Sequence, residues 1–148
     1  MSIPATLNAI CDLLKRETGL PAKAGVPGST AKGLFVWPYR LVRTESRAVL
    51  PRPPGAFPEP PQTSLDIPLL VLARPAFSDA GLDMLDAAMH ALMENTIVTF
   101  QNGQARLSFD TRLDIAELCA LFTAARLQPG LALELVARTT ITRGVPVP

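Results

Sequence analysis

Five side chains that could bind a metal ion or move protons recur along one predicted helix. Their spacing of three and four residues aligns them on one helix face: Asp79, Asp83, Asp86, His90 and Glu94. Carboxylates and an imidazole in such a row could hold a divalent cation or act as general acid and base. A carboxylate-bridged metal site also needs ligands from a facing helix, and no second predicted helix offers them. We therefore interpret the row as a solvated face and expect no catalytic residue, metal or cofactor, with a small metal-assisted or acid/base enzyme as the alternative.

Other candidates for chemistry are weaker. Cys11 and Cys119 stand among apolar residues of predicted helices and form no C-x-x-C pair, so we expect two buried free thiols. The glycine-rich stretch between Gly19 and Gly33 lacks the spacing of a phosphate-binding loop, and no predicted strand precedes it. We interpret this stretch as a connecting loop.

The composition narrows the class of protein. A length of 148 residues fits one domain, residues 1–148, and 48% hydrophobic residues supply enough apolar surface for a core. Fourteen basic and thirteen acidic residues give a net charge of +1, so we expect neither nucleic acid nor an anionic membrane as a partner. No apolar run approaches the ~18 residues of a membrane span, and the N-terminus lacks a signal-peptide pattern. We expect cytoplasmic residence.

The hydrophobic periodicity predicts three helices. The first begins near Ile3, and Gly19 ends it. Ser78 or Asp79 can cap the second, whereas Asp114 and Glu117 form a capping-box pattern at the start of the third, which Pro129-Gly130 closes. The residues expected to face the core are Leu82, Leu85, Met89 and Leu92 in the second helix and Leu118, Leu121, Phe122 and Ala125 in the third.

Two strands are predicted before the second helix. Residues 34–43 alternate aromatic and aliphatic side chains, and Pro38 in their middle indicates a sheet edge, a bulge or a break between two shorter strands. Residues 65–73 are apolar on both faces, so we expect this strand at the centre of the sheet.

Two further strand regions follow the second helix. A hairpin with its turn at Asn102-Gly103 joins residues 96–100 to residues 105–110, and residues 131–142 alternate like a long strand with one wet face. The whole pattern predicts an α+β fold, with a mixed, mainly antiparallel sheet flanked by about three helices.

A proline-rich segment lies between the first two strands. Six of the thirteen residues from 50 to 62 are proline, which favours a stiff, extended chain. With Arg43, Arg47 and Arg52 near its start and Phe57 at its centre, this segment is either an arm that docks on a neighbouring subunit or a surface crossover loop. Residues 144–148 are expected to form a flexible tail.

The order and spacing of these segments resemble the cap, or tail-terminator, proteins of contractile injection systems. The resemblance spans roughly Ile3 to Thr142 and lies in Leu34–Leu41, Leu65–Leu72, the Leu82–Glu94 helix leading into Ile97–Thr99, Ala105–Phe109, Leu113–Leu127 and Leu131–Val136. Pro38 interrupts an aromatic strand that is commonly continuous in the family. In the family, the residues just before the last strand are more polar and aromatic than Pro129-Gly130-Leu131. Both departures affect the expected pairing of the strands.

The resemblance implies a non-enzymatic subunit, typically of a hexameric ring, that ends tube and sheath growth at the distal end of the particle. Its partners would be further copies of itself and the tube and sheath subunits, assembled in the cytoplasm into a phage-tail-like particle that can be released. Some relatives carry C-terminal extensions, so a chain that stops at Pro148 is expected to be a minimal, N-terminal-domain form. An oligomeric scaffold domain with an unrelated partner would share the same elements.

For a ring subunit we expect the contacts on loops. Our hypothesis assigns them to the arm over residues 43–62 and to the hairpin over residues 101–104, and it lets an exposed strand edge accept an added strand from the sheath. The candidate interaction residues are Arg43, Arg47, Arg52, Phe57, Gln101, Asn102, Gly103 and Gln104.

Overall fold

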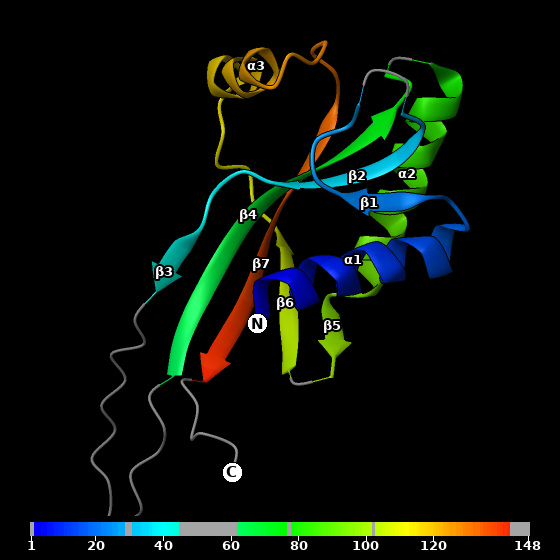
Figure 1. Ribbon diagram of the computed structural model, residues 1–148. Helices are drawn as coiled ribbons and strands as arrows, with labels where there is room; N and C mark the ends of the chain where they lie inside the picture. Colours follow the sequence, from blue (N-terminus) through cyan, green and yellow to red (C-terminus); the bar gives the residue numbers. More distant parts are fainter. Residues whose placement is uncertain (1, 29–30, 45–61, 77, 102, 143–148) are drawn as a thin grey trace, which may run out of the picture.

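The computed structural model describes residues 2–28, 31–44, 62–76, 78–101 and 103–142. These residues form three helices and one seven-stranded sheet (Figure 1). The elements follow one another as α1 (Ser2–Thr18), β1 (Ala22–Ala24), β2 (Gly33–Pro38), β3 (Val42–Thr44), β4 (Gln62–Arg74), α2 (Asp79–Glu94), β5 (Ile97–Phe100), β6 (Gly103–Phe109), α3 (Ile115–Ala124) and β7 (Ala132–Thr142). The expected α+β class is confirmed. Of the described helices, none is long and apolar enough to cross a membrane.

The long strands β4 and β7 form the centre of the sheet. Across the sheet the strands run β1-β2-β4-β7-β6-β5, and β3 also pairs with β4. Only β1 and β2 pair in parallel among the described strands, so the sheet is mixed and mainly antiparallel, as expected. The apolar strand predicted over residues 65–73 is β4, and its position at the centre is confirmed.

A proline in β4 explains why the strand predicted over residues 34–43 is broken into β2 and β3. The Tyr39 N–H donates to the Pro68 carbonyl at 3.2 Å. In an antiparallel pair, the reciprocal bond would run from the N–H of residue 68 to the carbonyl of residue 39. Pro68 has no N–H, so the pairing lapses and resumes only at Val42. Of the possibilities expected for Pro38, the structure shows the break between two shorter strands.

The sheet is covered on both faces, which gives two cores. The larger core lies between the sheet and the layer of α1 and α2, and it includes the alternate β4 residues Leu65, Ile67, Leu69 and Val71. The smaller core lies under α3, where Leu70 and Leu72 of β4 pack with Phe35 and Phe122. Figure 1 shows α3 at one end of the sheet, with α1 lying across the other strands. Trp37 extends this smaller core, because its ring lies edge-on to Phe122 with the centroids 6.2 Å apart.

The second helix begins where its cap was predicted, but its buried face differs. The Ser78 hydroxyl accepts the Gly81 N–H at 2.9 Å. The buried residues of α2 are Gly81, Leu85, Ala88, Ala91 and Leu92, whereas Leu82 is exposed and Met89 is half-buried. Small alanines line this face because α2 packs against α1 and the sheet at once, and both approach closely.

The third helix is shorter than expected. Its capping box is confirmed, with the Asp114 carboxylate accepting the Glu117 N–H at 2.7 Å. The helix ends at Ala124, well before Pro129-Gly130, because Arg126 takes the left-handed conformation at φ 57°. Of its predicted stripe only Phe122 is fully buried, and the remaining members are half-buried: Leu118, Leu121 and Ala125.

Two smaller expectations are corrected. The stretch predicted to be a loop contains β1, whose three residues are too few for a periodic signal. β1 lies close beside β2 because residue 33, at φ 115°, is a glycine. A Cβ at this position would lie 2.7 Å from the Pro21 carbonyl oxygen, so only glycine allows this approach. Cys11 is buried, but Cys119 is exposed, since α3 presents only a narrow face to the sheet.

The hairpin is confirmed with a different register. Gly103 pairs with Phe100 as the first residue of β6, so it lies in the strand and not in the predicted turn. A Cβ at position 103 would lie 3.0 Å from the Phe100 ring, so the glycine lets that ring lie across the strand. Asn102 lies outside the described residues.

Candidate protein-interaction surfaces

The acidic row on α2 stays a solvated face. All five of its members are exposed: Asp79, Asp83, Asp86, His90 and Glu94. His90 Nε2 lies 3.5 Å from Asp86 Oδ1, a contact between residues one helical turn apart. Among the residues that the structure describes, no group of three His, Cys, Asp or Glu side chains is placed to hold a metal ion. The alternative of a metal-assisted enzyme therefore has no assembled site in this part of the chain.

The sheet register places the base of the predicted arm and the predicted hairpin contact at the same end of the sheet. Arg43 pairs with Leu65, Leu65 with Thr139, and Thr139 with Ala105. These four residues form a row across β3, β4, β7 and β6, which spans about 14 Å at the usual strand spacing. Arg43 and the described hairpin residues Gln101, Gly103 and Gln104 are all exposed. The predicted residues Arg47, Arg52, Phe57 and Asn102 lie outside the described residues.

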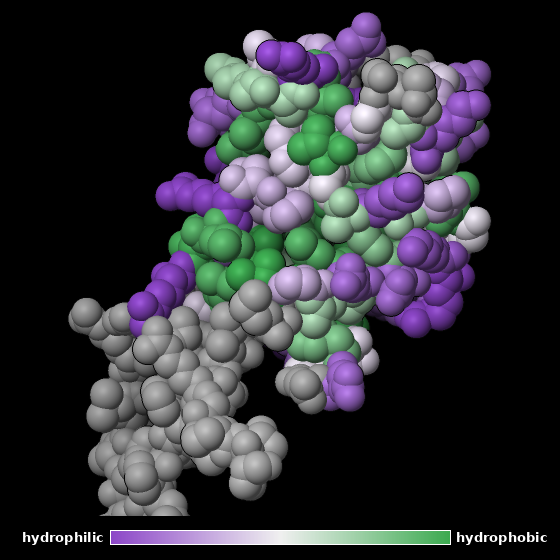
Figure 2. Space-filling view, in the orientation of Figure 1, coloured by the Kyte–Doolittle hydropathy of each residue, from purple (hydrophilic) through white to green (hydrophobic). Residues whose placement is uncertain are grey.

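Apolar side chains are exposed near this end of the molecule. Figure 2 shows them gathered over β4, between β3 and the start of α1. Leu41, between β2 and β3, is one of the large apolar residues that stay exposed in the folded chain. Exposed apolar surface next to polar loops is typical of a protein-binding site.

The outer strand β5 has an open edge. The Leu107 N–H donates to the Thr96 carbonyl, so the alternation of an antiparallel ladder turns the backbone groups of Val98 and Phe100 toward β6. The N–H and C=O groups of Ile97 and Thr99 then point away from the sheet, and no other described strand pairs with them. On the opposite side of the sheet, the outer strands β1 and β3 have only three residues each and carry a lysine and an arginine, features that protect an edge. Of the described edges, β5 is therefore the one where strand addition is best accommodated.

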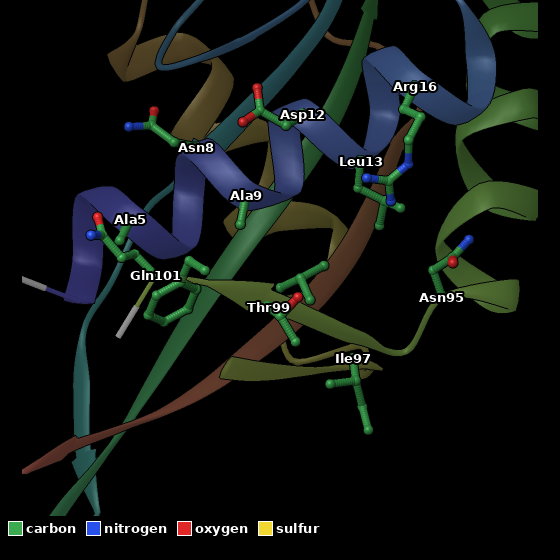
Figure 3. Close-up of a pocket in the computed structure, with 12 residues that line it drawn as sticks. Ala5, Asn8, Ala9, Asp12, Leu13, Arg16, Asn95, Ile97, Thr99 and Gln101 are labelled. Carbon is green, nitrogen blue, oxygen red and sulfur yellow. The ribbon is translucent and has the colours of Figure 1, made fainter. Parts of the chain in front are cut away.

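A groove of about 430 Å³ runs along this edge, between α1 and β5 (Figure 3). Ala9 projects from α1 toward β5, and Ile97 on the strand points away from the helix. Small side chains on α1 therefore leave room beside the unpaired backbone groups. The groove is lined by Ala5, Asn8, Ala9, Asp12, Leu13 and Arg16 of α1 and by residues 95 and 97–101.

A polar network supports the opposite face of the sheet. Arg138 on β7 donates from Nε and Nη2 to the two oxygens of Asp66 on β4, at 2.7 and 3.0 Å. These hydrogen bonds, with the nearby positive charges of Arg138 and Arg112, lower the pKa of Asp66 despite its burial. Arg112 Nη2 lies 3.8 Å from the same carboxylate. The network joins the two central strands to the loop before α3.

Glu134 organises the neighbouring part of this face. Its Oε1 accepts the Tyr39 hydroxyl at 2.9 Å and the backbone N–H groups of Arg112 and Leu113 at 2.8 and 3.0 Å. Burial, then the hydrogen bond to Glu134 and its negative charge, raises the pKa of Tyr39 above its ordinary value. Sequence reasoning missed both networks, since partners 72 and 95 positions apart leave no local signal.

Comparison with solved structures shows that this mixed sheet, with helices on both faces, has the fold of two terminator proteins of contractile injection systems. The chain is similar to the sheath/tube terminator of the extracellular contractile injection system PVC in its extended state, with a TM-score of 0.69 and 10% identity over 98% of this chain and 58% of that chain. It is also similar to the tube-terminating cap of the anti-feeding prophage, with a TM-score of 0.67 and 13% identity over 93% of this chain and 54% of that chain.

These similarities confirm the expected resemblance at the level of the fold. The chain spans little more than half the length of either structure. No family model matches the sequence. No curated protein matches it either.

Proposed function

We propose that this chain is a structural, non-enzymatic cap subunit that ends the polymerisation of tube and sheath at the distal end of a contractile injection system. The observation that carries the proposal is the similarity over 98% of the chain to a protein that is a sheath/tube terminator. The proposed assembly is a hexameric ring formed in the cytoplasm as part of a phage-tail-like particle. A terminator needs a rigid domain with complementary surfaces for ring closure and exposed segments for the last tube and sheath subunits.

The exposed residues that the structure describes at one end of the sheet suit such contacts. We assign contacts with the tube or the neighbouring subunit to the arm over residues 43–62 and to the hairpin over residues 101–104. Arg43 and the hairpin support this assignment because the register brings them to the same end of the sheet. The sheath contact is assigned to the β5 edge, where the outward groups of Ile97 and Thr99 can pair with an added strand.

The test is the mass of the purified chain by light scattering, alone and with matching tube and sheath, combined with negative-stain images of both samples. A ring of six, or assembly only at tube ends, is the expected result. A monomer or dimer that never associates with tube or sheath would contradict the proposal.

Charge reversals test the arm separately. Arg47→Glu with Arg52→Glu should weaken ring formation or capping, because each change replaces attraction by repulsion at a contact. Lys15→Glu with Lys23→Glu is the control, since these exposed lysines of α1 and β1 lie outside the arm and the hairpin. Unchanged ring formation and unchanged capping by the arm variant would remove Arg47 and Arg52 from the contact.

A further inference from the structure

The last residue of β4, Arg74, is a buried cation whose hydrogen bonding is incomplete. Its relative exposure is 8%, and its Nη2 donates to the Gln128 carbonyl at 3.5 Å. Its Nη1 is inaccessible to solvent and has no hydrogen-bond partner in the described part of the chain. A buried guanidinium with an unused donor costs free energy, and the same burial lowers the pKa of Arg74. A partner that supplies negative charge would offset this cost.

Arg74 lines a pocket in which two further cations converge. The pocket has a volume of about 520 Å³ and lies where the loop before β2, the end of β4 and the loop after α3 meet. Lys32 comes from the first of these segments and Arg126 from the last. The other described lining residues are Gly28, Ala31, Pro75, Ala76, Leu127 and Gln128, so no carboxylate balances the three positive charges. Arginine and lysine together bind an oxyanion through charge-assisted hydrogen bonds.

The backbone at Arg126 supports a role for this pocket. Its φ of 57° is in the left-handed region, which is uncommon for a residue with a side chain. The Arg126 N–H donates to the Thr123 carbonyl, and the Leu127 N–H donates to the Phe122 carbonyl, so the turn that carries Arg126 is fixed to α3. The cation is therefore held at the pocket by an ordered turn.

Apolar side chains stand next to the charged pocket. A smaller hollow shares Pro75 and Ala76 with it and is lined by Leu82 and Leu131 as well. Leu82 is 41% and Leu131 60% exposed. An inorganic anion or a nucleic-acid phosphate would leave these leucines in water, whereas a protein segment would cover them.

We propose that this pocket binds the carboxylate of an acidic side chain on a protein partner, with an apolar residue of the same segment covering Leu82 and Leu131. The inference rests on the proposed function for the identity of the partner, which is a subunit of the same particle. The exposed Arg126 donates hydrogen bonds to the carboxylate, and the positive charges of Lys32 and of the buried Arg74 add to its attraction.

Zero-length crosslinking on the full chain with purified tube and sheath tests the contact. A water-soluble carbodiimide condenses an amine and a carboxylate in contact into an amide, and the carbodiimide takes up the released water as a urea. We expect mass spectrometry to find the Lys32 peptide joined to an Asp or Glu peptide of another subunit. Lys32→Arg should abolish this crosslink but keep capping, because it retains the charge.

Charge removal gives the second readout. Lys32→Gln with Arg126→Gln should weaken association with the particle roughly tenfold, the loss expected for charge-assisted hydrogen bonds. Lys15→Gln with Lys23→Gln removes the same charge outside the pocket and should leave association unchanged. Arg74→Met should also weaken association. Its thermal unfolding midpoint should be equal to or above that of the wild type. Because Lys32 and Arg126 are exposed, the double variant decides the outcome even where Arg74→Met does not fold.

The outcomes separate the inference from the proposed function. A wild-type chain that caps tubes, with a double variant that caps equally well and no Lys32 crosslink to another subunit, overturns the inference alone. Failure of the wild type to associate with tube or sheath overturns the proposed function, and a Lys32 crosslink between copies of this chain would then still support the pocket. Sodium phosphate that raises the unfolding midpoint of the wild type but not of the double variant, without any crosslink, shows a site for free anions and overturns protein docking.

Discussion

Arg138 holds the buried carboxylate of Asp66 through two hydrogen bonds, yet the two partners differ sharply in their access to water. The Asp66 side chain is 5% exposed, whereas the Arg138 side chain is 58% exposed. Loss of Asp66 and loss of Arg138 therefore have different consequences for the partner that stays. Arg138 without Asp66 can be hydrated, but Asp66 without Arg138 is left as a buried charge.

This asymmetry predicts unequal costs for the two single substitutions. Arg138→Met should lower the free energy of unfolding by about 2 kcal/mol, less than is usual for a buried pair, because Arg112 stays near the carboxylate. Asp66→Asn should cost about 1 kcal/mol, since the arginine can turn to solvent. Urea unfolding of both variants measures the difference. Equal costs, or a larger cost for Asp66→Asn, would contradict the assigned burial.

The same pair predicts a dependence of stability on pH. The pKa of Asp66 is lower in the folded chain than in the unfolded chain. The bridge therefore stabilises the fold above about pH 4, and its contribution is lost as the pH falls from there through the folded pKa. In acid, the stability of the wild type should decline more steeply than that of Asp66→Asn, measured by urea unfolding at a series of pH values. Equal slopes of the two stability curves in acid would show that Asp66 contributes nothing to the loss of stability at low pH.

Tyr39 should titrate unusually late. It is the chain's one tyrosine, so the ultraviolet absorbance of phenolate reports on this residue alone. Because its pKa is raised in the folded chain, its contribution to stability is present below about pH 10 and is lost as the pH rises beyond that value. Phenolate should therefore form only above that pH, and Glu134→Gln should move the titration toward the ordinary value. An ordinary titration in a chain that is still folded by circular dichroism would be inconsistent with the Glu134 contact.

Thr139 offers a stabilising substitution. Its hydroxyl is buried and has no hydrogen-bond partner in the described ranges. Thr139→Val keeps the shape and removes the unpaired hydroxyl, so it should raise the free energy of unfolding by about 1 kcal/mol. Thr139→Ser is the matched control, which keeps the hydroxyl and loses a methyl group, and it should be destabilising. Thermal and urea unfolding of both variants measure the signs, and a less stable valine variant would refute the prediction.

A proline in β5 tests whether its open edge accepts a strand. The N–H of Thr99 points away from β6, so Thr99→Pro removes an outward donor without breaking the hairpin ladder. Under the proposed function, this variant should fold, shown by its circular dichroism, but should lose its association with sheath. Thr99→Val, which keeps the N–H, should associate normally. A proline variant that still binds sheath would exclude pairing at this edge.

The elements with strong local signals could be predicted from the sequence. The capping box at Asp114 and the apolar run of β4 depend only on neighbouring residues, and both are present in the structure. The order of such segments was sufficient to indicate the terminator fold. Strand pairing was less accessible, because the break between β2 and β3 depends on Tyr39 lying opposite Pro68, which no local signal reveals.

The candidate sites, like the fold, could be predicted only where the signal is local. The exposed hairpin and the base of the arm follow from turn and proline signals, and their roles stay predictions. The cationic pocket was not predictable, because Lys32, Arg74 and Arg126 come from three distant parts of the sequence. The burial of Arg74 at the end of β4 distinguishes this pocket, and that burial depends on tertiary packing.

The edge-on contact of Trp37 with Phe122 gives the chain a built-in optical reporter. Trp37 is its single tryptophan, so the fluorescence excited at wavelengths that only tryptophan absorbs comes from one place, where α3 meets the sheet. A binding event that displaces α3 should shift the emission to longer wavelength, as the indole meets more water. An event confined to the hairpin and the base of the arm should leave the spectrum unchanged. Emission recorded as copies of this chain assemble with one another therefore distinguishes which end of the subunit is engaged, without any label.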